Sequence, residues 1–284
     1  MNKVFACING AVASTGVCDY AAWAAQRLDA PLELLHVLDR HPEVAPVSDY
    51  SGSIGLGAQE ALLTQLTALD EARSKLSSEH GRQLLEAARQ RAAAAGVVKL
   101  DVRQRHGTLI ETLLDMQPAA RLFVMGQNHR IDSVGKIHLD HNVERVVRTV
   151  VRPVLLAGNE FRVPERFVIA FDGSATGRTM VQAVARSPLL AGLRCDLVMA
   201  TEDSAVAPEP RLWARSTLER AGFDVQSVLA AGEPEVVLLD YVRKESIDLL
   251  VMGAYGHSRI RQLIVGSTTT TLLRTSPEPV LVLR

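Results

Sequence analysis

A glycine-rich segment in the last forty residues or so of the chain carries the residue types best suited to bind a phosphate. Its glycines, Gly253, Gly256 and Gly266, follow an apolar run that reads as a strand. Three hydroxyl residues come next, at the start of a predicted helix: Ser267, Thr268 and Thr269. Glycines accept positive φ and close approach of a ligand, and a helix start offers free N–H groups. The pattern predicts a phosphate site; the alternative is two ordinary glycine turns and a helix cap.

Two charged residues lie inside the same segment. His257 either touches a phosphate or is an exposed loop histidine, and the exposed loop is the favoured interpretation. Arg259 either balances phosphate charge or belongs to a solvated loop. The sequence contains no G-x4-G-K-[ST] motif and no G-x-S-x-G motif. It therefore supports neither a P-loop ATPase nor a serine hydrolase elbow.

The strands and helices that position this segment belong to a sequence pattern that occurs twice along the chain. Lys3–Gly10 in the first half matches Arg166–Gly173 in the second. Val124–Gly126 likewise matches Val251–Gly253. Gly107 and Gly232 each open an amphipathic pattern, and the apolar runs 153–156 and 279–282 form a fourth pair. Four matches in the same order indicate a tandem duplication.

Each half alternates short apolar runs with helical periodicity. We predict strands at 3–8, 32–37, 98–104, 121–126 and 153–157, then at 166–171, 194–200, 224–229, 248–253 and 279–283. We predict helices at 14–28, 59–95, 107–117 and 140–149, then at 175–187, 209–221, 233–245 and 267–275. Apolar strands alternating with helices predict two tandem, doubly wound, five-stranded parallel sheets of the Rossmann type. Ligands of such sheets bind where the strand order reverses, so Asp172 and Gly253 are expected at one crevice.

The two domains are predicted at 1–157 and 164–284, with the polar segment from Gly158 as linker. The first is longer because of extra residues over about 39–85, which include a Gly/Ser-rich tract and a long helix. This insertion is either a variable surface segment, which is favoured, or a lid or docking surface. The last strand of each half is apolar, so the two edges are expected to cover each other as a pseudo-two-fold pair. The sequence leaves a homodimer of the whole chain open.

The whole chain resembles a tandem universal stress protein, with two such domains fused. The resemblance is carried by Ile169–Ser174, Gly232-Glu233-Pro234 and the run from Val251 into the glycine pattern. It implies a fold like that of adenine nucleotide alpha hydrolases and ATP binding where the glycine motif is intact. It also implies the site residues: Asp172 toward the adenosine, with Ala170 and Phe171 beside it, the backbone of Met252 and Gly253 along the nucleotide, and Gly256, Gly266, Ser267, Thr268 and Thr269 at the ribose and phosphates.

The first half departs from this pattern at the positions of Asp172, Gly256 and Gly266 and at the hydroxyl residues that follow. Asn9 stands in place of Asp172, and His129 in place of Gly256. Asp140 takes the position of Gly266, where a carboxylate would repel a phosphate. The first half is therefore expected to keep the fold and to have lost the nucleotide. His129, His138, Asp140 and His141 suit a divalent metal, but their spacing matches no known site, so no metal is predicted.

Composition excludes several classes of protein. Hydrophobic residues make up 47% of the chain, and the net charge of −1 leaves no basic footprint for nucleic acid. No apolar run is long enough for a membrane helix, and the N-terminus has no signal-peptide pattern. Cys7, Cys18 and Cys195 show no metal spacing, which suits free thiols in a reducing cytoplasm.

The leading functional hypothesis is a regulatory, stress-responsive protein that binds one ATP in the second half. Mg²⁺ is expected to arrive with the nucleotide. Turnover is expected to be slow or absent because no catalytic base or nucleophile is evident beside the phosphates. The alternative is a nucleotide-independent interaction scaffold that uses the 39–85 insertion as a docking surface. A third hypothesis, an adenylyl-transfer or electron-transfer enzyme, lacks residues for a second substrate.

Overall fold

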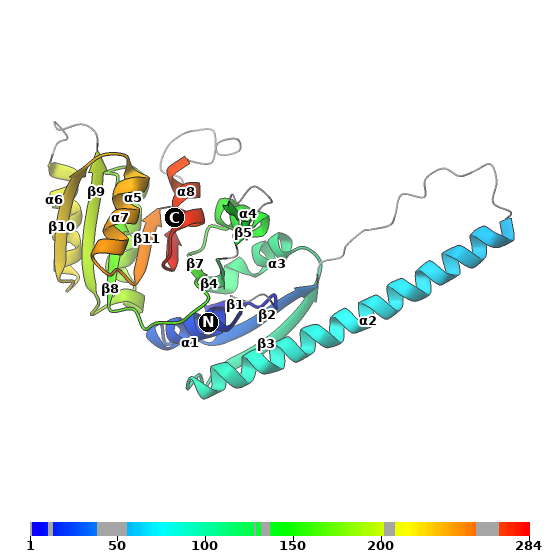
Figure 1. Cartoon of the computed structure of the whole chain (residues 1–284). Helices are drawn as coiled ribbons and strands as arrows, with labels where there is room; N and C mark the ends of the chain where they lie inside the picture. Colours follow the sequence, from blue (N-terminus) through cyan, green and yellow to red (C-terminus); the bar gives the residue numbers. More distant parts are fainter. Residues whose placement is uncertain are drawn as a thin grey trace.

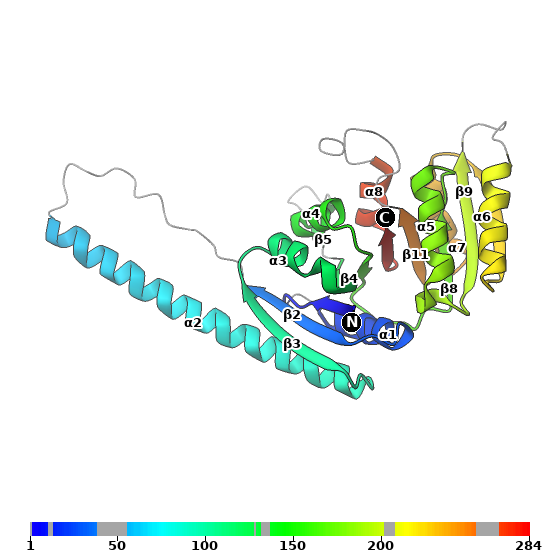
Figure 2. The ribbon, with the colours of Figure 1, turned by 180° about the vertical axis from the view of Figure 1, so that it is seen from behind.

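The computed structural model of the chain describes residues 2–10, 14–38, 56–127, 129–131, 137–201, 208–253 and 267–284. They form an α/β body from which one long helix projects (Figures 1 and 2). The predicted elements of both halves are present, mostly within two residues of the expected bounds. Most strands form where the chain is apolar over four to eight residues, and helices where apolar residues recur every three to four positions. The edge strand at Leu100–His106 is largely polar.

The first half contains five strands of the main sheet and four α-helices. The strands are β1 (Lys3–Cys7), β2 (Leu32–Leu38), β3 (Leu100–His106), β4 (Ala120–Gly126) and β7 (Val154–Ala157). The helices are α1 (Ser14–Arg27), α2 (Leu56–Ala94), α3 (Leu109–Met116) and α4 (His141–Thr149), with a 3-10 turn η1 (Gln117–Ala119) after α3. Thr108 begins α3 with a reciprocal cap, because its hydroxyl accepts from the Glu111 N–H and donates to the Glu111 carboxylate.

The second half repeats the same order. Its strands are β8 (Arg166–Ala170), β9 (Arg194–Thr201), β10 (Val225–Ala231), β11 (Leu249–Gly253) and β12 (Val280–Leu283). Its helices are α5 (Ala175–Arg186), α6 (Glu209–Arg220), α7 (Pro234–Lys244) and α8 (Ser267–Thr275), with a 3-10 turn η2 (Pro188–Leu190) after α5. The duplication extends to backbone geometry: Gly107 and Gly232, each just before the third helix of its half, both have a φ of +131°.

All ten strands join in one sheet, in the order β10-β9-β8-β11-β12-β7-β4-β1-β2-β3. Neighbours are parallel within each half, and β12 pairs with β7 antiparallel at the centre, with Leu281 opposite Leu155. The predicted pseudo-two-fold pairing through the last strands is therefore confirmed. The two edges hydrogen-bond to each other, which removes both exposed edges at once. The sheet twists across this join, so the strands of the two halves run in different directions in Figure 1.

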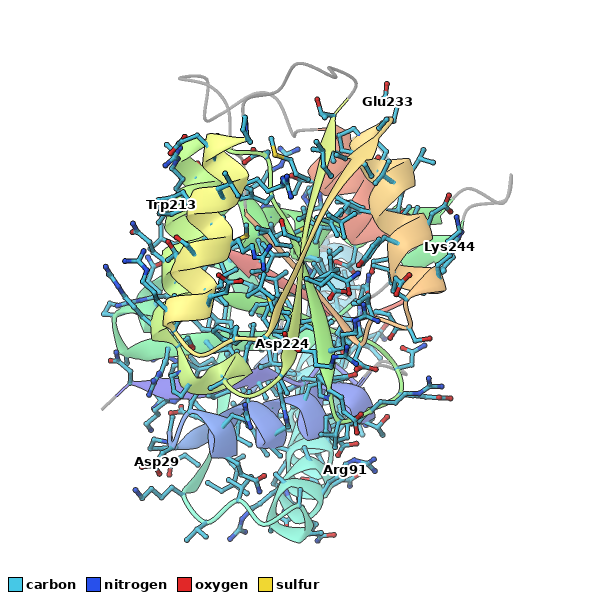
Figure 3. All side chains as sticks on the ribbon, turned by 90° about the vertical axis from the view of Figure 1, so that its left-hand side faces the viewer. Asp29, Arg91, Trp213, Asp224, Glu233 and Lys244 are labelled. Atoms are coloured by element: carbon cyan, nitrogen blue, oxygen red, sulfur yellow. The ribbon has the colours of Figure 1, made fainter. Side chains whose placement is uncertain are left out.

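Helices cover both faces of the sheet and bury one apolar layer on each. Along β1, Val4 and Ala6 point into one layer, while Phe5 and Cys7 point into the other. The first layer contains buried residues of α1, α2, α5 and α6, and the second contains those of α3, α4, α7 and α8. Figure 3 looks onto the β10 edge and shows α6, with Trp213, and α7, with Lys244, on opposite faces. This is the doubly wound arrangement expected from strands that are apolar on both faces.

A short hairpin was not predicted from the sequence, and the long helix of the insertion was. A short antiparallel hairpin, β5 (His129–Ile131) and β6 (Ile137–Leu139), follows β4 in the first half. Strands of three residues are too short to give a periodic signal in the sequence. The predicted long helix of the insertion is α2, and only its C-terminal part packs on the sheet, at Leu85, Ala88 and Ala92. The Gly/Ser-rich tract predicted over 48–57 lies almost entirely outside the described residues.

Candidate functional site

In each half the strand order reverses at one point, which is where doubly wound sheets form their ligand crevice. In the second half, β8 has β9 on one side and β11 on the other, with Ala170 opposite Met252. The chain leaves both strands at this edge, at Asp172 after β8 and after Gly253 at the end of β11. A Cβ placed on Gly253 would lie 3.5 Å from Cγ2 of Thr176, in the first turn of α5. The structure therefore brings the Asp172 turn and the end of β11 together, as the topology predicts.

The Asp172 turn is held by local hydrogen bonds. The Asp172 carboxylate accepts from the Ser174 N–H at 3.0 Å, and Gly173 takes a φ of +74°. Ser174 in turn caps α5 by accepting from the Gly177 N–H at 3.0 Å. A carboxylate held in this way stays exposed at the edge of the crevice and keeps a fixed orientation.

Gly177 is a site residue that the sequence reasoning missed. A Cβ at this position would lie 2.5 Å from Oδ1 of Asp172 and 3.2 Å from the Phe171 ring. The carboxylate thus occupies the space where a side chain on the first turn of α5 would stand. A glycine three residues after the Asp-Gly-Ser segment is the only signal in the sequence, and glycine is otherwise disfavoured in a helix.

Three predicted site residues reach the crevice through their backbones. The side chains of Phe171 and Met252 are buried in the two apolar layers, and Ala170 packs against one of them. A side-chain role for these three residues is therefore not available. Gly253 ends β11 as a paired strand residue opposite Leu283, within the predicted strand 248–253, and it does not adopt a positive φ. Its missing side chain leaves the strand end bare instead.

The start of α8 carries the predicted hydroxyl residues. Ser267 is its first residue, and the Thr268 hydroxyl donates to the Glu235 carboxylate at 3.1 Å. Thr269 lies in the same first turn. The hydroxyl oxygen of Thr270 is buried and has no partner among the residues that the structure describes. Sequence reasoning assigned neither Glu235 nor Thr270, because the contact with Glu235 joins two helices far apart in the chain.

Four of the predicted site residues, Gly256, His257, Arg259 and Gly266, lie outside the described part of the chain. The site as described therefore consists of the Asp172 turn, the bare end of β11 and the start of α8. A helix start with hydroxyl side chains suits an anionic group. A carboxylate beside it, Glu235, suits a cation that would accompany such a group.

The matching crevice of the first half has different chemistry. Asp140 caps α4, and its carboxylate accepts from the Asn142 N–H at 2.7 Å. A fixed negative charge therefore stands at the helix start that corresponds to the start of α8. The turn at Asn9 is exposed, but α2 lies beside it: a Cβ on Gly10 would lie 3.0 Å from Leu84 and 3.8 Å from His80. Within the described residues, no three His, Cys, Asp or Glu side chains are grouped as metal ligands would be.

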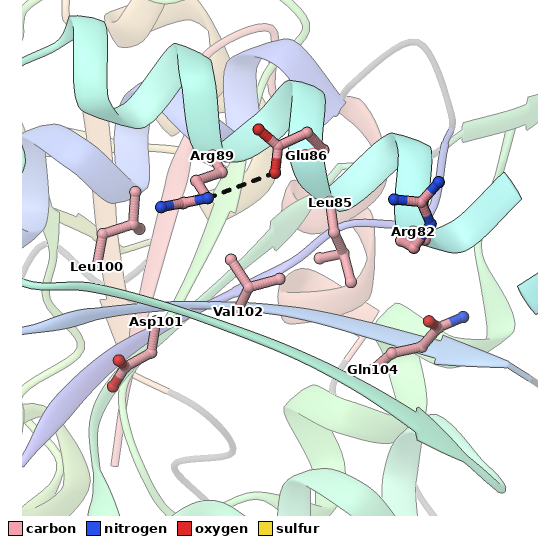
Figure 4. Close-up of a pocket in the computed structure, with 8 residues that line it drawn as sticks. All are labelled: Arg82, Leu85, Glu86, Arg89, Leu100, Asp101, Val102 and Gln104. Carbon is pink, nitrogen blue, oxygen red and sulfur yellow. Dashed lines mark ion pairs between the residues drawn. The ribbon is translucent and has the colours of Figure 1, made fainter. Parts of the chain in front are cut away.

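A groove of about 380 Å³ lies away from both crevices, between α2 and the edge strand β3 (Figure 4). Leu85 of α2 and Val102 of β3 face each other across it, and Arg89 pairs with Glu86 at 3.6 Å on its rim. The groove shares no residue with the Asp172 crevice. It is the gap left where α2 departs from the sheet. Arg82 and Arg89 pair with glutamates of α2, and Asp101 of β3 pairs with Lys3.

The three cysteines are free and buried. Burial raises the pKa of the Cys7 thiol to about 12 and that of Cys18 to about 11, and it also raises the pKa of Cys195. Protonated, buried thiols are neither nucleophiles nor metal ligands at neutral pH. No helix of the described chain is long and apolar enough to cross a membrane.

The chain consists of two doubly wound halves that share one sheet, and each half has its own reversal of strand order. This architecture places it among duplicated α/β proteins of the Rossmann type. Comparison with known sequences narrows this class. The model of the Universal stress protein family matches residues 1–157 and again 164–284. The universal stress protein Slr1230 of Synechocystis is 34% identical over 287 residues, covering 100% of both chains. The chain belongs to the universal stress protein family, as a tandem member.

Solved structures agree on the fold. A universal stress protein from Archaeoglobus fulgidus superposes with a TM-score of 0.71 at 17% identity, covering 100% of this chain and 96% of the other. Protein PA1789 from Pseudomonas aeruginosa gives a TM-score of 0.64 at 15% identity, with coverage of 100% and 92%. A shorter sequence match, at 29% identity, reaches the universal stress protein MJ0577 of Methanocaldococcus jannaschii over 25% of this chain and 43% of that protein.

Proposed function

We propose that the chain is an ATP-binding universal stress protein with a regulatory role in the stress response, which binds one nucleotide in its second half. The observation that carries the proposal is the contrast between two equivalent helix starts. α8 opens with Ser267 and the Thr268 hydroxyl, whereas α4 opens with the Asp140 carboxylate already bonded to the helix backbone. The Asp140 carboxylate sits on the cap of α4 itself and would repel a phosphate there. At α8 the nearby carboxylate is Glu235 of α7, which fits a phosphate that arrives with its Mg²⁺. The proposed units are 1–157, with the degenerate site, and 164–284, with the intact motif.

The roles follow from the chemistry of each group. The Asp172 carboxylate would accept hydrogen bonds from the adenosine, and the bare backbone at Gly253 would let the nucleotide approach. The start of α8 would hold the phosphates, together with Gly256, Gly266 and the charged loop residues His257 and Arg259. Mg²⁺ bound with the nucleotide would neutralise phosphate charge, and Glu235 offers a carboxylate ligand of the kind it prefers.

Turnover is proposed to be slow or absent. The glycines and hydroxyls assigned to the phosphates include no general base at neutral pH. A general base must reach the attacking water with a free acceptor. Three unpaired thiols also suit a reducing compartment such as the cytoplasm.

Isothermal titration with Mg-ATP tests the proposal. We expect a stoichiometry near one. Gly266→Asp should abolish binding because it recreates the Asp140 situation at the start of α8, while Gly135→Asp in the first half serves as the matched control and should leave binding unchanged. A stoichiometry near two would contradict the degenerate first half. Full affinity in a folded Gly266→Asp protein would contradict the phosphate assignment.

The second candidate function is an interaction scaffold that uses the insertion, and it is favoured by the exposure of α2 beyond the body of the molecule. Mass spectrometry of ligands released from protein purified from cells separates the two. A stoichiometric adenine nucleotide supports the first function. A ligand-free protein that also fails to bind Mg-ATP supports the scaffold function.

A further inference from the structure

The projecting part of α2 is exposed to solvent along its whole described length. Every residue from 64 to 77 is exposed, although this stretch makes about four helical turns. Its leucines are among the most exposed large apolar residues of the described chain: Leu66 at 44%, Leu69 at 66% and Leu76 at 72%. Figures 1 and 2 show the helix leaving the body at this point. An isolated helix of this length is marginal in water, so a partner is needed to stabilise it.

The leucines follow the spacing of a coiled-coil seam. Leu66, Leu69, Arg73 and Leu76 are separated by steps of three, four and three residues, as at the a and d positions of a heptad. A helix turns about 100° per residue, so Leu76 lies about 180° around the axis from Leu85, which packs on the sheet. Leu66, however, lies on the same side of the helix as Leu84, which packs against the core. The seam is therefore accessible because this stretch of α2 projects beyond the body of the molecule (Figure 1). A second helix can reach it without displacing the sheet or α1.

We propose that this seam pairs with the same seam of a second copy, in an antiparallel two-stranded coiled coil centred near residue 71. The pairing is isologous, so it closes on itself as a two-fold dimer and leaves no seam exposed. Because α2 lies outside the Asp172 crevice, the dimer does not depend on nucleotide binding. It makes a four-domain assembly from two tandem chains.

Charge selects this orientation and this occupant. In a parallel pair in register, Arg73 would face Arg73 of the other copy inside the seam, where like charges repel. In the antiparallel pair, Leu66 meets Leu76 of the second copy, and Arg73 meets Leu69 with Asp70 beside it. The two Asp70 carboxylates and two Arg73 guanidinium groups then gather at the two-fold axis with no net charge. The seam is therefore complementary to the same seam of a second copy, because Asp70 balances the charge of Arg73.

Sedimentation equilibrium of the full chain at micromolar concentrations tests the dimer. We expect a mass of twice 30.8 kDa for the wild type. Leu69→Glu should give a monomer, because the carboxylate would enter the apolar seam. Leu212→Glu on α6, where the leucine is 54% exposed, is the matched control and should remain dimeric. A monomeric wild type, or a Leu69→Glu protein that stays dimeric, would overturn the proposal, with circular dichroism confirming that each variant is folded.

A cysteine cross-link tests the orientation. Ala72 flanks the seam and meets Ala72 of the second copy only when the helices are antiparallel about residue 71. Ala72→Cys is therefore expected to form a covalent dimer under mild oxidation. Ser74→Cys, on the outer face of the same helix, is expected to form little. The native cysteines are buried and do not compete. Equal cross-linking at both positions, or none at position 72, would contradict the antiparallel pairing.

Discussion

At the scale of single residues, the duplication preserves a buried ion pair. Lys3 of β1 contacts the Glu33 carboxylate of β2 at 2.8 Å, and Arg166 of β8 contacts Asp196 of β9 at 2.7 Å. The two pairs occupy the same places in their halves. Both carboxylates are almost fully buried between strands, where removing one partner leaves an uncompensated charge. Asp196 also accepts from the Tyr241 hydroxyl, and burial together with this charge raises the pKa of Tyr241 to about 12.

We expect Asp196→Asn to lower the free energy of unfolding by about 3 kcal/mol, because Arg166 would lose its buried counter-charge. Urea denaturation at neutral pH measures this difference. The matched control is Asp101→Asn, which removes an exposed partner of Lys3 at 2.6 Å and should cost less than about 1 kcal/mol. Equal losses for the two variants would show that burial is not what makes the Asp196 pair important.

At the scale of elements, α8 is held at both ends by different halves of the chain. Its first turn contacts α7 through Thr268 and Glu235. Its last turn is capped from the first half, because the buried Gln127 side chain donates to the carbonyls of Leu273 at 3.0 Å and Ser276 at 3.2 Å. In return, Arg284 donates to the carbonyl of Val147 at 2.8 Å, near the end of α4. Each half therefore caps the last helix of the other and satisfies its free carbonyl groups.

Gln127→Ala is expected to lower the free energy of unfolding by about 2 kcal/mol, because buried carbonyls at the end of α8 would lose their donor. Differential scanning calorimetry with matched urea denaturation measures the change. The control is Gln83→Ala on α2, where an exposed amide donates to Glu79 at 3.1 Å and should contribute little. If the two variants have equal stability, the cap does not connect the halves energetically.

At the scale of the whole molecule, the antiparallel join of β7 and β12 makes one sheet out of two. The buried thiols report on this continuity, because Cys7 lies in the first half and Cys195 in the second. We expect none of the thiols to react with Ellman's reagent in the native state at neutral pH. In partial denaturant, Cys7 and Cys195 should react at the same rate, because opening one half breaks the central pairing. Clearly different rates would show that the halves open independently.

The same thiols give the sign of the pH dependence. The pKa of Cys7 rises from its ordinary value of 9.0 to about 12 on burial, so the unfolded chain ionises first as pH increases. The free energy of unfolding should thus be unaffected by these groups below pH 9.0 and fall as pH rises toward 12. Urea midpoints at neutral pH and at about pH 10 test this direction. A midpoint that rises with pH would contradict the burial of the thiols.

Local patterns in the sequence determined most of the elements and their duplication. Apolar runs predicted most of the strands and periodicity predicted the helices. The capping of α5 by Ser174 and of α4 by Asp140 was found in the structure. The contrast between Gly266-Ser267 and Asp140-His141 could also be recognised in the sequence, because a phosphate site at a helix start depends on neighbouring residues. The assignment of nucleotide to that site remains a prediction from these residues.

Only the tertiary structure decided what depends on residues distant in the chain. The contacts of Arg166 with Asp196, of Gln127 with α8 and of Thr268 with Glu235 join segments that no local pattern relates. The predicted strand 248–253 already included Gly253, and its partner strand β12 became known only from the structure. The sequence by itself determined which faces are apolar. Which face meets which neighbour was decided by packing, because many apolar strands and helices are locally alike and only their joint burial selects one arrangement.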